Sequence, residues 1–160
     1  MTDTIYYPLL MLALLAVYLA LPGCGGAVQT HSTAIRVSAG TIAVGGAMIS
    51  EARSQALDRI TEETEGQPRE ERAEALREES ARWDPIGATI NTGKEILQAW
   101  HDTVEAIEAG AENLWVRVPL LVGRLVRLWN RTVELARTLG VDLPVIPSQV
   151  TAIVGSFGGG

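Results

Sequence analysis

Apolar residues recur at alternating intervals of four and three residues through the middle of the chain, and no other pattern constrains its fold as strongly. Such spacing places these residues on one side of an α-helix, where they can pack against partner helices. Gly93 leaves a hole in this pattern, which a side chain or backbone from a partner helix can fill. We call the following residues the seam: Ile86, Ile90, Gly93, Leu97, Trp100, Val104 and Ile107.

The composition favours helices throughout the chain. Its 160 residues include a single Phe, and no run of alternating β-branched residues predicts a strand. We therefore predict an all-α fold with an N-terminal hydrophobic leader or anchor helix (residues 1–23) and a tether (24–32). A three- to four-helix bundle with heptad seams (33–140) follows. Residues 141–160 are predicted to form an extended linker, a short apolar helix and a glycine tail.

A second helix is predicted before the seam, where Ile35, Ile42 and Ile49 lie seven residues apart. Most residues around these isoleucines are small, including Gly45 and Gly46, so another helix can approach closely. Each glycine also lowers the intrinsic stability of a helix by about 1 kcal/mol relative to alanine. This helix therefore needs a partner to be stable.

Residues 51–82 form a strongly charged zone with ten carboxylates and six arginines. Charges of both signs at intervals of three and four residues are typical of a solvated helix. The zone is interrupted near Gly66, and we predict that Ile35–Ile60 and Arg69–Arg82 form a helical hairpin that turns there. Asp84-Pro85 predicts the start of a separate helix, with Asp as N-cap and Pro in the first turn.

The last long helix is predicted from about Asn113 to Leu139, with Pro119 near its start and Gly140 as its C-terminal cap. Arginines border its broad apolar face. We favour an ordinary bundle helix whose arginines pair with the acidic residues of 62–79, and the alternative is contact with an anionic membrane or a partner. The candidate contact residues are Arg117, Arg124, Arg127, Arg131, Trp115 and Trp129.

The N-terminal segment Ile5–Leu21 contains no charged residue. As a helix it would be about 25 Å long, which suits either a cleaved signal or a retained membrane anchor. It is followed by Leu21-Pro22-Gly23-Cys24, and Cys24 is the only cysteine of the chain. A single cysteine cannot form an intramolecular disulfide.

An apolar run followed by small residues and a lone cysteine resembles the leader of bacterial lipoproteins. The resemblance implies that the thiol of Cys24 is alkylated with diacylglycerol and that the leader is removed, so that Cys24 becomes the lipid-bearing N-terminus. It also implies a protein anchored to a membrane and facing the periplasm or the outside. The alternative is an inner-membrane protein that retains Ile5–Leu21 as its single span.

The sequence contains no recognisable catalytic or metal-binding motif. His31 and His101 are the only histidines and the sequence has no Cys/His cluster, which disfavours a zinc site. No phosphate loop, dinucleotide fingerprint or nucleophile elbow occurs. The net charge of −6 also disfavours binding to nucleic acid. We predict no cofactor and no metal.

These features predict a membrane-tethered helical protein with a structural or interaction role in the cell envelope and no catalysis. We expect two kinds of partner: membrane lipid, through Cys24 or Ile5–Leu21, and either another protein or a second copy of the chain. The size, leader and helical body also resemble small envelope lipoproteins of bacteriophages, including spanin subunits, so a lysis-associated or virion membrane protein is an alternative. An enzyme with an unrecognised site is a further one.

Overall fold

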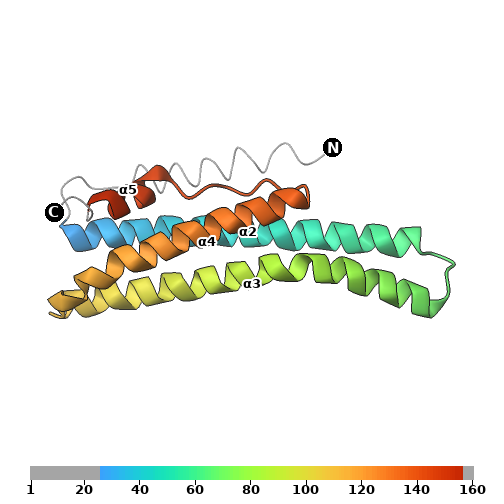
Figure 1. The fold of residues 1–160 in the computed structure, drawn as a ribbon, viewed down its shortest axis with the longest axis horizontal. Helices are drawn as coiled ribbons and strands as arrows, with labels where there is room; N and C mark the ends of the chain where they lie inside the picture. Colours follow the sequence, from blue (N-terminus) through green and yellow to red (C-terminus); the bar gives the residue numbers. More distant parts are fainter. Residues whose placement is uncertain (1–25, 157–160) are drawn as a thin grey trace.

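Long helices make up nearly all of the computed structural model, which describes residues 26–156 (Figure 1). They are α2 (Ala27–Glu63), α3 (Arg69–Glu108), α4 (Val118–Thr138) and α5 (Ser148–Ser156), with the short 3₁₀ helix η1 (Glu112–Arg117) before α4. The described residues contain no strand, and the predicted all-α fold is confirmed. The predicted leader, Cys24 and the three C-terminal glycines lie outside the described residues.

Helices α2 and α3 form the predicted antiparallel hairpin, which turns near Gly66 (Figure 1). The helices contain 37 and 40 residues, so each is about 55–60 Å long. Gly66 adopts a φ of 91°, a left-handed conformation that glycine accommodates without steric cost. The hydroxyl of Thr64 donates to the carbonyl of Ile60 at 2.7 Å and closes the end of α2.

The separate helix predicted to start at Asp84-Pro85 is not found, because α3 continues through Pro85. Trp83 is 4% exposed and Ile86 is 1% exposed, so residues on both sides of the proline are packed into the core. Pro85 itself points to solvent. Tertiary packing therefore holds the helix across the proline, and α3 is bent along its length in Figure 1, as expected of a helix with an internal proline.

The predicted tether is also wrong from residue 27 onward, because α2 begins at Ala27. The first turns of α2 pack against the body, and the ring of His31 is buried there beside two indoles. Its centroid lies 5.9 Å from that of Trp100, in an edge-on arrangement, and 5.2 Å from that of Trp115. These contacts fix the first turns of α2 against α3 and η1, although the local sequence is polar and lacks a helical repeat.

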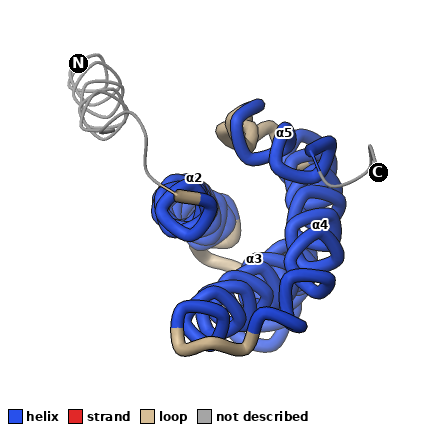
Figure 2. Tube along the Cα trace, turned by 90° about the vertical axis from the view of Figure 1, so that its left-hand side faces the viewer, coloured by secondary structure: helices blue, strands red, loops and turns tan. Residues whose placement is uncertain are grey.

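After α3, Gly110 turns the chain with a φ of 105° into η1, and α4 then packs along α3. The helix predicted from Asn113 therefore begins as a 3₁₀ turn, with the α-helix starting at Val118 and Pro119 in its first turn. Gly140, with a φ of 78°, ends α4 as predicted. An extended segment then leads to α5, and the end-on view shows α2, α3, α4 and α5 around a common interior (Figure 2).

All seven seam residues are buried in that interior. The hole at Gly93 is filled by Ile42 of α2, because a Cβ at position 93 would lie 3.4 Å from the Ile42 Cδ1 atom. Gly45 forms a second hole, which the indole of Trp129 from α4 occupies. The seam is therefore the core of the bundle, filled by α2 and α4 of the same chain.

Candidate functional site

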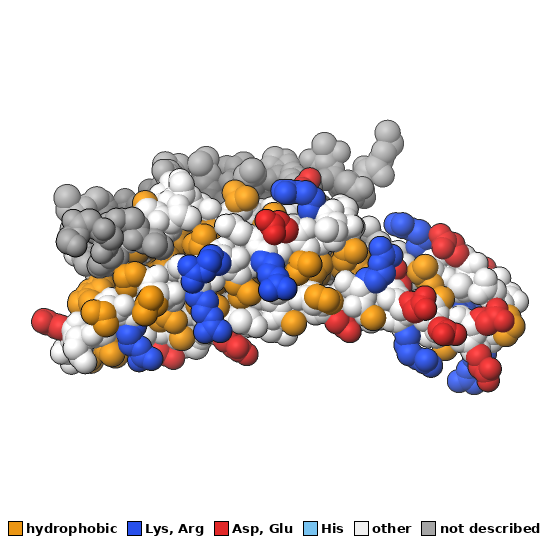
Figure 3. All heavy atoms as spheres, viewed as in Figure 1, with side chains coloured by type: hydrophobic (Ala, Val, Ile, Leu, Met, Phe, Trp, Pro, Cys, Tyr) orange, Lys and Arg blue, Asp and Glu red, His pale blue; other side chains and the backbone are white. Residues whose placement is uncertain are grey.

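The α2–α3 hairpin extends beyond the end of α4 as a two-helix projection (Figure 1). We call residues 51–82 the distal arm and the rest of the described chain the body. Every buried hydrophobic residue lies in the body, and the one buried residue of the arm is Thr64. The arm carries ten carboxylates and six arginines, and its charged side chains crowd that end of the molecule in Figure 3. It is a solvated rod that contributes little to the core.

A small polar network joins the arm to the body. The indole N–H of Trp83 donates to the carboxylate of Glu79 at 3.0 Å, and Arg82 donates to the other oxygen of that carboxylate at 3.0 Å. The Trp83 hydrogen bond, together with Arg82, lowers the pKa of Glu79. Across the hairpin, the Arg53 guanidinium donates to the hydroxyl of Ser80 and lies 3.7 Å from the carboxylate of Asp84. These contacts fix the hairpin register where the arm leaves the body.

The four arginines of α4 and η1 form a second surface, which we call the basic face. Its residues are Arg117, Arg124, Arg127 and Arg131. All four side chains are exposed, and none forms an ion pair within the described residues. The predicted pairing with the acidic residues of 62–79 is therefore wrong, because those residues lie in the arm beyond the end of α4. Basic side chains also lie over the centre of the body in Figure 3.

The two tryptophans predicted to contact a membrane or partner lie in different environments. Trp129 is 2% exposed, its indole N–H donates to the carbonyl of Pro144 at 2.8 Å, and its ring covers Gly45. The contact prediction is wrong for Trp129, because its side chain belongs to the core. Trp115 is half-buried beside His31, so a contact role for Trp115 stays a prediction.

Sequence reasoning missed two exposed apolar residues next to the basic face. Val116 is 74% exposed and Leu120 is 72% exposed. They lie four residues apart on the same side as Arg117 and Arg124, so a helical wheel that places Leu121 toward the core also places Leu120 outside. The position of Leu120 on that wheel was the sequence signal that could have shown its exposure.

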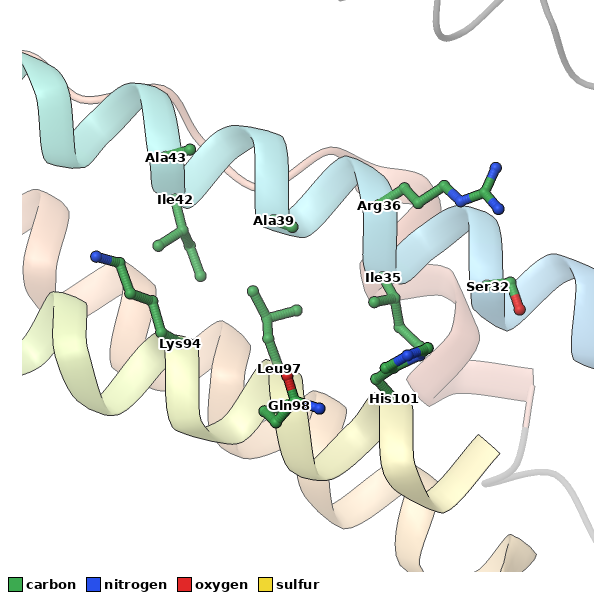
Figure 4. Close-up of a pocket in the computed structure, with 10 residues that line it drawn as sticks. All are labelled: Ser32, Ile35, Arg36, Ala39, Ile42, Ala43, Lys94, Leu97, Gln98 and His101. Atoms are coloured by element: carbon green, nitrogen blue, oxygen red, sulfur yellow. The ribbon is translucent and has the colours of Figure 1, made fainter. Parts of the chain in front are cut away.

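A groove of about 400 Å³ lies between α2 and α3 near the start of α2 (Figure 4). Ile35, Ile42 and Leu97 point into the space between the two helices, whereas the guanidinium of Arg36 points away from it. The lining contains basic side chains but no carboxylate, so it lacks an acid–base pair of carboxylates. The lining residues are Ser32, Ile35, Arg36, Ala39, Ile42, Ala43, Lys94, Leu97, Gln98 and His101.

Two further properties bound the chemistry of the described residues. No group of three or more His, Cys, Asp or Glu side chains among them could hold a metal ion. Within the same part of the chain, one helix, Val28–Glu63, is long and apolar enough to span a membrane, with a mean hydropathy of 1.2 over its most apolar stretch. The body already buries 39% of that stretch, and a core helix of a bundle passes the same test.

Comparison with known proteins gives no family assignment. No protein-family model, no curated protein and no solved structure matches this chain.

Proposed function

We propose that this protein is a membrane-tethered helical scaffold or adaptor, with a structural or interaction role and no catalysis. The observation that carries the proposal is the distal arm, a charged two-helix projection whose packing adds little to the core. A bundle that needed only to fold would gain little from extending two helices past its third one. The arm is best explained as a surface that meets another protein.

The tether is the second part of the proposal. The uncharged segment Ile5–Leu21 is long enough to act as a signal or anchor, and Cys24 offers a thiol for lipid attachment. The start of α2 lies at one end of the body and the arm lies at the other (Figure 1). A tether at residue 24 would therefore leave the start of the arm about 36 Å away and its tip about 55 Å away, measured along α2.

The tether is tested by intact mass of the protein from the membrane fraction, for the wild type and for Cys24→Ser. We expect a species that begins at Cys24 and carries diacylglycerol and acyl mass, absent from the variant. A chain that begins at Met1 in both would mean that Ile5–Leu21 is retained as an anchor. Recovery of the protein only in the soluble fraction would contradict the tether in either form.

The role of the arm is tested by site-specific photo-crosslinking in native membranes. A photoreactive residue replaces exposed Arg72 in the arm, and a control chain carries it at exposed Thr151 in α5. We expect a discrete protein adduct from position 72 that is absent from position 151. Equal labelling from both positions, or none from the arm, would contradict an interaction role for the arm.

A further inference from the structure

Helical spacing places the basic face and two exposed hydrophobic residues on the same side of η1 and α4. Val116 and Leu120 are two of the three large hydrophobic residues that stand exposed in the described chain. The same side of η1 and α4 carries Arg117, Arg124 and Arg127. Exposed apolar side chains beside cations are typical of helices that lie at the surface of a lipid bilayer.

The charge of this surface is opposite in sign to the net charge of the whole protein. The segment from Asn113 to Val133 contains four arginines and no carboxylate, although the chain as a whole carries a net charge of −6. None of these arginines forms an ion pair within the described residues, so their guanidinium groups are available to an external anion. Guanidinium groups bind phosphate oxygens in a bidentate geometry.

We propose that the basic face docks the body onto the phosphate headgroups of an anionic lipid bilayer, with Val116 and Leu120 entering the interface. The inference rests on the proposed tether, which supplies the bilayer. Figure 1 places η1 and the start of α4 at the same end of the body as the start of α2, where the chain leaves toward residue 24. A tether at that end holds the basic face at a high effective concentration beside the membrane.

A second copy of the chain is the competing occupant, because the arm bears four more carboxylates than arginines (10 against 6) and so complements the basic face. The exposed side chains of Val116 and Leu120 favour a lipid bilayer over a second copy of the chain. The third large hydrophobic residue that stands exposed is Val145, which follows α4, so the arm presents none that could cover Val116 and Leu120. A lipid interface satisfies both the charges and the apolar side chains.

The test is photo-crosslinking from position 120 of the otherwise full-length chain. The chain carries Leu120→p-benzoylphenylalanine and is reconstituted into vesicles of phosphatidylcholine and phosphatidylglycerol at equal molar ratio. We expect lipid adducts in which phosphatidylglycerol exceeds phosphatidylcholine by roughly tenfold, since each arginine near an anionic surface favours it. The preference should fall toward unity when Arg117, Arg124, Arg127 and Arg131 are all changed to Gln.

A matched control removes the same charge elsewhere. Changing the exposed arm residues Arg59, Arg69, Arg72 and Arg77 to Gln should leave the lipid preference unchanged. A covalent dimer formed from position 120 would identify a second copy as the occupant and overturn the inference. Vesicle-bound protein without lipid adducts, or with adducts lacking a headgroup preference, would overturn it and leave the tether standing. Protein that fails to sediment with the vesicles would refute the tether, and the docking inference with it.

Discussion

At the residue scale, Gly45 of α2 is the glycine of the described chain that another side chain approaches most closely, and that side chain is Trp129 of α4. A Cβ at position 45 would lie 2.5 Å from the Trp129 Cη2 atom, whereas a Cβ at Gly40 would meet nothing within 4 Å. We predict that Gly45→Ala lowers the free energy of unfolding by about 1–3 kcal/mol through overpacking. Gly40→Ala, the matched control, should raise it by up to about 1 kcal/mol. Urea denaturation followed by tryptophan fluorescence measures both.

A second substitution distinguishes a clash with the Trp129 indole from a general intolerance of side chains at position 45. Trp129→Phe removes the six-membered ring that contacts Gly45, so Gly45→Ala should cost less in that background than in the wild type. Additive costs would show that the indole does not set the requirement for glycine.

His31 makes stability depend on pH, because burial lowers the pKa of its imidazole from 6.5. Above about pH 6.5 the ring is neutral in both the folded and the unfolded chain, and this group adds no pH dependence. Below that value the unfolded chain binds a proton that the folded chain does not, so stability falls as the pH falls. The loss attributable to His31 should reach at most about 1.4 kcal/mol per pH unit. Denaturation between pH 5 and 7.5 should show a shallower dependence for His31→Leu, and parallel curves for both proteins would contradict the prediction.

These residues also mark the limit of sequence reasoning. Gly93 was predictable as a hole in the seam, because its place in the heptad repeat puts it in the core. The burial of His31 was not, since it depends on Trp100 and Trp115, which are distant in the sequence. The helical repeat places Trp129 on the apolar face of its helix, but its contacts with Gly45 and Pro144 were not predictable. A single sequence contains no signal that joins such positions.

At the element scale, α3 tests how far packing can override local propensity. Pro85 supplies no N–H to the helix, and its ring disfavours straight geometry. Since its side chain is exposed, alanine fits there without strain. We predict that Pro85→Ala raises the free energy of unfolding by about 1–3 kcal/mol, measured by urea denaturation.

Pro68, which precedes the first turn of α3, provides the control. Pro68→Ala should bring no gain, because a helix tolerates proline at its start and the substitution frees the unfolded chain. If Pro85→Ala instead lowered stability, the bend would be needed to seat Trp83 and Ile86 in the core.

The boundaries of α3 show why the sequence predicts the presence of a helix better than the residues at which it begins and ends. The heptad repeat identified the seam helix, and Gly66 with Pro68 located the hairpin turn, since both signals are local. Asp84-Pro85 is equally local, and it predicted a boundary that the structure lacks. Burial of Trp83 and Ile86 outweighs the cost of the proline, and that balance depends on α2 and α4.

At the scale of the whole molecule, a packed body and a solvated arm share the same two helices. The body holds every buried hydrophobic residue and carries the basic face on η1 and α4, whereas the arm carries the acidic excess. If the chain is tethered at residue 24, the tether lies at the end of the body where η1 begins, and the arm lies at the other end of the hairpin. This arrangement assigns lipid contact to the body and protein contact to the arm.

The division predicts that the arm can be shortened without unfolding the body. The hydrogen bond between Arg53 and Ser80 marks the hairpin register. Deleting residues 57–63 and 69–75 removes seven residues, about two helical turns, from each helix and rejoins the helices through the same turn, residues 64–68, so the register and the Trp83–Glu79 network are kept. None of the removed residues is buried, so the free energy of unfolding should change by less than about 1 kcal/mol.

Deletion of α5 provides the contrast, because it removes the buried side chains of Val150 and Ile153 and should cost several kcal/mol. Urea denaturation compares the two variants, and photo-crosslinking from the remaining arm tests function in the shortened chain. We expect the shortened chain to fold, to stay in the membrane fraction and to lose its protein adduct. If shortening the arm unfolded the body, the arm would be a stabilising element of the fold. Its presence would then be explained without a protein partner.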